Sequence, residues 1–355
     1  MKRTLALILA VVMVFALCAC GSGSSAPAQT TTKTEPSASE TASAPAASGE
    51  KVTIKLCAID PAEQNTNDVL RECIAEISER TNGMVDIQLY TDGQMLVYAE
   101  GVEAVMSNAN VIVVSQSSYL SDYLPFMSVF GSPYVFPSRE VALEFFHSDF
   151  FAGLAQEAEE AGVHIICADA LTGFRSMITN VPITSVDELR KLNVRIAGLD
   201  GLIQLFENMG CNYQVFPFGE CFNALQTGAI DGLENTPTGI NSGHFYDAIN
   251  PLYYDLTNHI MDGYFLITGA EFWASIPEEY RDVIQEVLGQ WGTKTTALLE
   301  EQEAELFDLM IENGTEIVEI EDLSEFRSYA EPIVKAMDRG EEILAEIARI
   351  EAELG

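Results

Sequence analysis

Two spacings of hydrophobic residues organise most of this chain. Apolar alternation or short apolar runs predict β-strands over 52–56, 85–90, 111–114, 163–168, 173–180, 193–197, 231–235 and 263–268. Apolar residues at helical spacing predict helices over 63–80, 98–107, 138–146, 151–161, 277–312 and 323–354. Strands that alternate with helices in this way predict an α/β fold with mostly parallel sheets.

The first residues follow another pattern. The basic start Met1-Lys2-Arg3 precedes an apolar stretch from Leu5 to Leu17, which is short for a membrane span. Leu17-Cys18-Ala19-Cys20 then resembles the bacterial lipobox, whose cysteine receives a diacylglyceryl group and becomes the new N-terminus. We therefore predict a lipoprotein signal peptide over 1–19 and lipidation at Cys20, with an ordinary signal peptide as the alternative. Two acyl chains anchor durably, so we expect an extracytoplasmic protein that is lipid-anchored to the cell membrane.

Residues 20–50 carry almost no group that a folded core could bury. From Gly21 to Glu50 the chain consists largely of Ser, Thr, Ala, Pro and Gly. Such a composition predicts a disordered linker behind the lipid anchor. The folded body then begins near Lys51, and the roughly 300 residues that follow suffice for two domains with their own cores.

Charge and cysteine content narrow the function. The chain has 54 Asp and Glu against 18 Lys and Arg, a formal charge of −36, which argues against nucleic acid as a partner. Five cysteines follow Cys20, and an odd number cannot all pair within one chain. Their spacing contains no C-x-x-C, and we expect no metal site and no cofactor.

Arg195 is conspicuous because it lies between Val194 and Ile196 in an apolar strand. A buried guanidinium needs an anion, since an unpaired buried charge is costly. Its fork of donors matches a carboxylate at two points. The residues themselves leave open whether that carboxylate belongs to the protein or to a ligand.

Several motifs from Gly173 to His259 share one resemblance. They are Gly173-Phe174-Arg175, Leu192-Asn193-Val194-Arg195-Ile196, Pro217-Phe218-Gly219-Glu220, Ala224-Leu225-Gln226-Thr227-Gly228, Asp231-Gly232-Leu233-Glu234-Asn235 and Leu256-Thr257-Asn258-His259. In this order they resemble the DctP-type extracytoplasmic solute-binding proteins of tripartite ATP-independent periplasmic (TRAP) transporters. The likeness extends over nearly the whole body from Lys51 onward.

The resemblance implies a two-lobed fold of the periplasmic-binding-protein kind with long C-terminal helices. The first lobe is expected to comprise 51–172 and about 262–300, and the second 173–261 and about 301–355. A small organic acid would bind in the cleft between them and pass to integral-membrane transporter subunits. The protein is expected to be a monomer.

The resemblance also implies the site residues. Arg195 would clamp the ligand carboxylate, and Arg175 matches a second, more variable arginine whose alternative role is an ion pair at the protein surface. Asn235 would support the same carboxylate, although an asparagine before Thr236-Pro237 also suits a turn. Phe218 would pack against the ligand or belong to the core. Gln116, at a strand end, would be a polar ligand contact. His259 would line the site or be a structural histidine.

Motifs of hydrolases, metalloproteases and nucleotide-binding enzymes are missing from the sequence, so we expect a binding protein and not an enzyme. Two alternatives stay open: a binding protein of an ATP-driven importer, and an exported hydrolase of acidic glycans. One cationic clamp among neutral polar groups favours a sugar acid such as a uronate or aldonate, with a dicarboxylate second.

Overall fold

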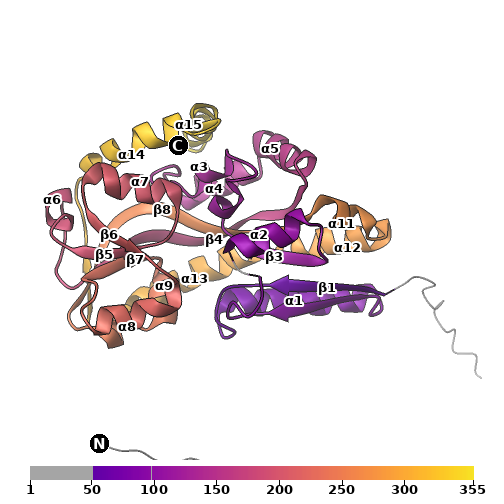
Figure 1. Cartoon of the computed structure of the whole chain (residues 1–355), viewed down its shortest axis with the longest axis horizontal. Helices are drawn as coiled ribbons and strands as arrows, with labels where there is room; N and C mark the ends of the chain where they lie inside the picture. The colour runs from indigo at the N-terminus through magenta and orange to yellow at the C-terminus, as the bar shows by residue number, and fades with distance from the viewer. Residues whose placement is uncertain (1–50, 97) are drawn as a thin grey trace, which may run out of the picture. The chain divides into compact units, whose positions relative to one another are not determined.

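The computed structural model describes residues 51–96 and 98–355. The predicted signal peptide, the lipidation at Cys20 and the linker over 20–50 lie outside these residues. Within them the fold is α/β, with one sheet of nine strands in the order β2-β1-β3-β8-β4-β7-β5-β6 and β9 paired to β8. Figure 1 shows helices packed around this sheet.

Two groups of short parallel strands lie at the two ends of the sheet. In the first, β1 (Val52–Cys57) pairs in parallel with β2 (Val85–Tyr90) and β3 (Val111–Ser115). In the second, β5 (Asn193–Ile196) pairs in parallel with β6 (Asn212–Val215) and β7 (Gly232–Asn235). The prediction of an α/β fold is confirmed, and five of the eight strand pairings among the described residues are parallel.

Two long antiparallel strands, β4 (Val163–Thr179) and β8 (Leu252–Gly269), join these groups through the centre of the sheet. The sequence pattern predicted β4 as two separate strands and only the last third of β8. The pattern is broken because their pairing shifts register at several bulges, one of them between Leu171 and Gly173. The short strand β9 (Thr315–Val318), which was not predicted, pairs in parallel with β8.

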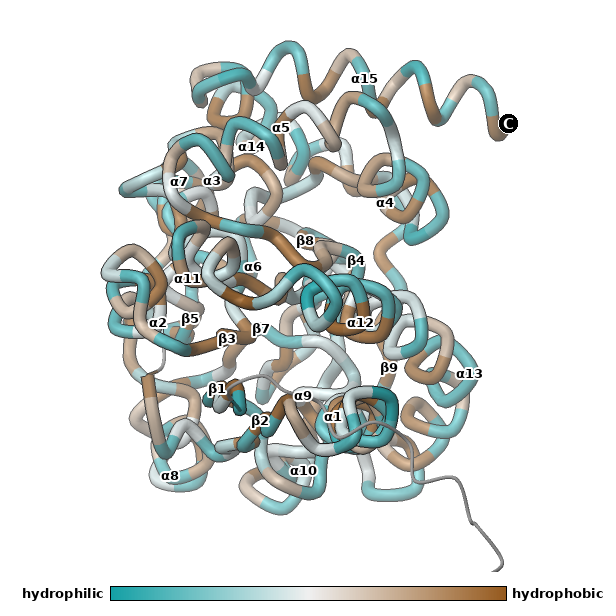
Figure 2. Tube along the Cα trace, turned by 90° about the vertical axis from the view of Figure 1, so that its right-hand side faces the viewer, coloured by the Kyte–Doolittle hydropathy of each residue, from teal (hydrophilic) through white to brown (hydrophobic). Residues whose placement is uncertain are grey.

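Helices supply the layers that cover the sheet. The longer ones are α1 (Asn65–Arg80), α2 (Tyr98–Met106), α4 (Arg139–Phe146), α5 (Asp149–Glu160), α7 (Asp200–Met209), α12 (Glu278–Leu288), α13 (Trp291–Glu312), α14 (Ser324–Ala336) and α15 (Gly340–Leu354). The shorter ones are α3 (Met127–Phe130), α6 (Val186–Leu189), α8 (Cys221–Gln226), α9 (Pro237–Gly243), α10 (Phe245–Ala248), α11 (Ala270–Ser275) and the 3₁₀ turns Ser117–Leu120 and Phe218–Glu220. Turns of α15 alternate between polar and apolar residues in Figure 2, as an amphipathic helix requires.

The buried side chains form separate clusters on the two sides of the molecule. Clusters around Ile54 and Phe145 belong to the residues of the predicted first lobe, and clusters around Phe206 and Tyr254 to those of the second. Helix α14 packs beside α7, whereas α15 packs against α4 (Figure 1) and buries Ile343 and Ile347 in the Phe145 cluster. The end of the chain, assigned by sequence to the second lobe, therefore also contacts the first; the two-lobe division stays a prediction.

The five cysteines of the body behave as small buried residues. Cys57, Cys73, Cys167, Cys211 and Cys221 are buried, and none of these five thiols forms a disulfide within the described residues. Burial raises the pKa of each thiol, which keeps it protonated. The described residues contain no helix that combines the length and the apolar character needed to cross a bilayer.

Candidate ligand-binding site

A cavity of about 440 Å³ lies where the parallel strands from both ends of the sheet terminate. Residues just after β1, β3 and β5 and at the end of β7 line it, together with residues of β4 and β8. Ligands gather at the carboxyl ends of strands in open α/β sheets because the following loops diverge there. Its lining combines charged, amide, hydroxyl and aromatic side chains.

Arg195 presents unused donors to this cavity. Its side chain is 7% exposed. Its Nε and one Nη2 hydrogen donate to the carbonyl oxygen of Phe216, at 3.1 and 2.9 Å. The nearest carboxylate, Glu234, lies 3.8 Å from Nη1, beyond hydrogen-bond distance. Because a guanidinium has five N–H donors, three have no acceptor among the described residues.

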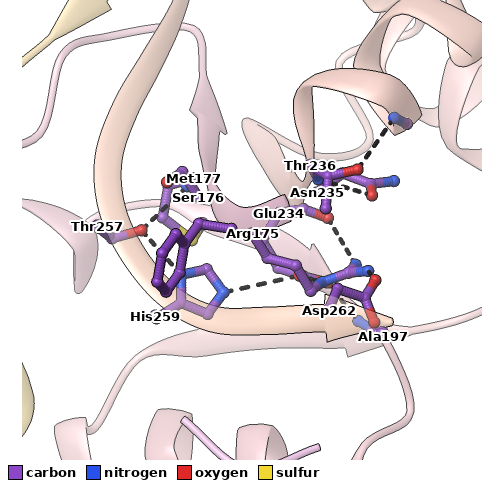
Figure 3. Close-up of polar contacts among 12 residues, drawn as sticks. Arg175, Ser176, Met177, Ala197, Glu234, Asn235, Thr236, Thr257, His259 and Asp262 are labelled. Carbon is purple, nitrogen blue, oxygen red and sulfur yellow. Dashed lines mark hydrogen bonds and ion pairs between the residues drawn. The ribbon is translucent and has the colours of Figure 1, made fainter. Parts of the chain in front are cut away.

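Arg175 lines the same cavity, but its guanidinium is already hydrogen-bonded to carboxylates of the protein (Figure 3). Its Nε and Nη2 donate to the two carboxylate oxygens of Glu234, with 3.0 Å between Nη2 and Oε1. Its Nη1 donates to Oδ2 of Asp262 at 2.6 Å. Of the two roles that the sequence left open for Arg175, the geometry favours the ion pair.

Glu234, which the sequence analysis did not select as a site residue, is the centre of this polar cluster. It is fully buried, and its Oε1 also accepts the backbone N–H of Ala197 at 2.8 Å. Burial by itself would raise the pKa of Glu234, but the charge and hydrogen bonds of Arg175 bring this pKa well below its usual range. Its only sequence signal was its position next to Asn235.

His259 does not line the cavity. It is 2% exposed and lies behind Glu234, whose Oε2 is 3.7 Å from its Nε2 (Figure 3). Its Nδ1 is 2.8 Å from Oγ1 of Thr257. Burial lowers the pKa of His259, so its imidazole is neutral near pH 7. This placement corresponds to the structural alternative, because β8 directs the ring toward the cluster and not toward the cavity.

The other three predicted residues do line the cavity. Gln116, directly after β3, donates from Nε2 to Oδ1 of Asp262 at 2.8 Å. Asn235 uses Oδ1 to accept the N–H of Thr236 at 2.8 Å, which leaves its amide N–H donors for another acceptor. The ring of Phe218 packs edge-on against the buried Phe245, so this ring belongs to both the core and the cavity wall.

Sequence reasoning missed an acidic and aromatic part of the lining. Asp60, three residues after the end of β1, accepts hydrogen bonds from Tyr264 at 3.0 Å and Thr66 at 3.1 Å. The rings of Tyr98 and Tyr119 lie 5.2 Å apart, centroid to centroid, on the same wall. Only the position of Asp60 after the first strand could have indicated it.

Comparison with known proteins assigns the chain to a protein family. A family model described as bacterial extracellular solute-binding protein, family 7, matches residues 59–340. The chain belongs to this family. A solute-binding protein of Chromohalobacter salexigens is 26% identical over 78% of this chain and 81% of its own length. The sialic acid-binding periplasmic protein SiaP of Vibrio cholerae is 24% identical over 86% of this chain and 95% of its own.

Solved structures agree with this assignment. A TRAP periplasmic solute-binding protein from Desulfovibrio salexigens, in complex with diglycerolphosphate, superposes with a TM-score of 0.80 at 26% identity, over 85% of this chain and 98% of that one. A TRAP protein from Chromohalobacter salexigens with bound D-glucuronate shares the fold, with a TM-score of 0.78 over 84% and 99% of the two chains. The family assignment supports a TRAP-type solute-binding protein over the hydrolase and the ATP-driven importer component.

Proposed function

We propose that this protein captures a sugar acid, such as a uronate or aldonate, in the cavity between the two strand groups. The observation that carries the proposal is Arg195, which lines the cavity of a solute-binding fold and has three N–H donors without an acceptor among the described residues. Two of those donors can grip a carboxylate in parallel. The amide N–H groups of Asn235 can donate to the same carboxylate, and the ring of Phe218 can pack against the ligand.

Neutral polar groups elsewhere in the lining suit the hydroxyls of such an acid. Gln116, Gln64 and Thr238 carry amide or hydroxyl groups, and the rings of Tyr98 and Tyr119, tilted by 56° to each other, add aromatic surface against which a sugar ring can pack. Relatives support a small organic acid as well: besides the sialic acid-binding protein, a C4-dicarboxylate-binding protein of Rhodobacter capsulatus is 27% identical over 68% of this chain and 72% of its own length. A dicarboxylate is the weaker choice because Arg175, the cation that would take a second carboxylate, is already paired.

Substitution of Arg195 tests this function. After a thermal-shift screen of uronates, aldonates, dicarboxylates and neutral sugars, calorimetry should show that Arg195→Ala weakens binding of the tightest acid by about 2–5 kcal/mol. Arg195→Lys should also weaken it, because lysine lacks the two-pronged geometry. Arg349→Ala, on the exposed face of α15, is the matched control and should bind normally. Equal affinity for a neutral sugar and its acid would refute the proposal.

Delivery and location complete the proposed function. The protein would bring its ligand, as a monomer and without chemistry of its own, to the integral-membrane subunits of a TRAP transporter. A lipid on Cys20 would tether it to the outer face of the cell membrane. Cys20→Ala should release the protein from membranes without a change in ligand affinity, and metabolic labelling with a fatty acid should mark the wild type alone. An unlabelled wild type would exclude the anchor.

A further inference from the structure

Asp60 is a carboxylate in the cavity wall that has no cation beside it. Tyr264 donates to its Oδ1 and Thr66 to its Oδ2, and both donors are neutral. No Lys, Arg or His of residues 51–96 and 98–355 lies within 4.0 Å of this carboxylate. Each oxygen keeps a further lone pair that the protein does not use, because a carboxylate accepts about four hydrogen bonds.

The charges around the cavity leave no positive charge for a second anionic group. Glu234 and Asp262 are both hydrogen-bonded to Arg175, and these two carboxylates against one guanidinium leave one excess negative charge. Arg195 lies 3.8 Å from Glu234 but, unlike Arg175, donates no hydrogen bond to a carboxylate of the described residues, so its guanidinium is the group that would take a ligand carboxylate. Asp60 adds a negative charge to this balance.

Asp60 and Arg195 act on the same space. Tyr98, which lines the cavity, has its pKa raised mainly by burial; Arg195 lowers this pKa and Asp60 raises it. Arg195, on the strand β5, and Asp60, after β1, therefore both line the cavity that Tyr98 lines. A ligand held by Arg195 in this cavity shares the cavity with the Asp60 carboxylate.

We propose that Asp60 is a specificity-determining residue that restricts the cavity to ligands with a single anionic end. It accepts a hydrogen bond from a hydroxyl at the far end of the ligand and repels a carboxylate there, because two like charges in a partly dry site destabilise each other. The inference rests on the proposed function, since it takes Arg195 as the clamp for the first carboxylate.

A matched pair of acids tests this selection. D-Gluconate and D-glucarate share one polyol chain and differ at one end, which is a hydroxymethyl group in the first and a carboxylate in the second. In calorimetry at pH 8 the wild type should bind gluconate at least about tenfold more tightly than glucarate. Asp60→Asn, which keeps the shape and can donate to a carboxylate, should reduce this ratio to within about threefold, chiefly by tightening glucarate. Glu63→Gln, a nearby exposed carboxylate, should leave the ratio unchanged.

The outcomes separate this proposal from the proposed function. If the wild type binds glucarate as tightly as gluconate, or if Asp60→Asn binds both acids at the wild-type ratio, the role of Asp60 is refuted while the carboxylate-binding function stands. If neither acid binds the wild type and Arg195→Ala changes no ligand's affinity, the proposed function fails and the Asp60 proposal with it.

A pH series on the wild type gives the same test without a variant. Burial raises the pKa of Asp60 to about 6 against the opposing hydrogen bonds of Tyr264 and Thr66. The titratable groups near it are Tyr264 and Asp262 on β8 and Tyr98 on α2, and both tyrosines stay protonated because burial raises their pKa. Between pH 8 and pH 5.5 the affinity for glucarate should therefore rise at least about threefold, and that for gluconate should change little. A glucarate affinity that is flat over this range overturns the proposal.

Discussion

Two arginines, Arg175 and Arg195, line the same cavity, but their guanidinium groups have different hydrogen-bond acceptors. Both are buried, and both lie in apolar strand sequences. Arg175 is held by Glu234 and Asp262, whereas Arg195 contacts only a backbone carbonyl at hydrogen-bond distance. A paired buried arginine stabilises the fold, and one with unused donors is available to a ligand. The distinction lies in the acceptors around each guanidinium.

Removal of the Glu234 charge tests this division. Glu234→Gln should cost about 3–5 kcal/mol of unfolding free energy, because it leaves a buried guanidinium partly uncompensated. Glu286→Gln, which breaks an exposed pair with Arg80, should change stability little. Urea unfolding of the wild type and both variants measures these changes in unfolding free energy. A loss for Glu234→Gln no larger than that of the surface control would show that the cluster is not stabilising.

Glu234 should also make the free energy of unfolding depend on pH in the acid range. The pKa of Glu234 is lowered on folding, so its contribution is fully present above its unfolded pKa near 4.5 and is lost as the pH falls below that value. In urea unfolding from pH 6 down to pH 3, the wild type should lose more stability than Glu234→Gln. Parallel pH curves for the two proteins would contradict the assignment.

At the scale of whole elements, β4 and β8 determine which residues face the ligand. Strand β8 brings Asp262 and Tyr264 to the cavity and directs His259 away from it. Because β4 is buried along nearly its whole length, its sequence shows no clear alternation of polar and apolar residues. Gly173 has a φ of +105° beside a register shift, a conformation that favours glycine, so the periodicity restarts there. These features explain why the pattern predicted two strands.

At the scale of the molecule, β4 and β8 run through both groups of hydrophobic clusters, while the cavity is lined from both sides. A ligand that contacts both sides favours the conformation in which they are closest. X-ray scattering of the chain from Lys51 to Gly355 should therefore show a smaller radius of gyration at saturating ligand. Arg195→Ala at the same ligand concentration should keep the larger value. An identical wild-type profile with and without ligand would count against closure.

The pattern along the chain predicted the class of fold, the strands β1, β2 and β3, the helices α1, α2, α4 and α5, and the importance of Arg195. It also predicted helix over 277–312 and 323–354, each of which contains two helices. These features depend on local periodicity and on the cost of an unpaired charge in an apolar strand, both of which are visible along the chain. The motifs around Asp231–Asn235 also placed the protein among the solute-binding proteins to which the family comparison assigns it.

Only the tertiary structure decided how the charges are partnered. Glu234, Asp262 and Asp60 lie far apart in a sequence that is rich in acidic residues, so no pattern distinguishes them from solvated carboxylates. The pairing of β4 with β7 and β8 brings Glu234 and Asp262 onto Arg175 and leaves Arg195 and Asp60 facing the cavity. Long-range strand register, which depends on packing across the whole sheet, therefore selects which charges meet each other and which meet the ligand.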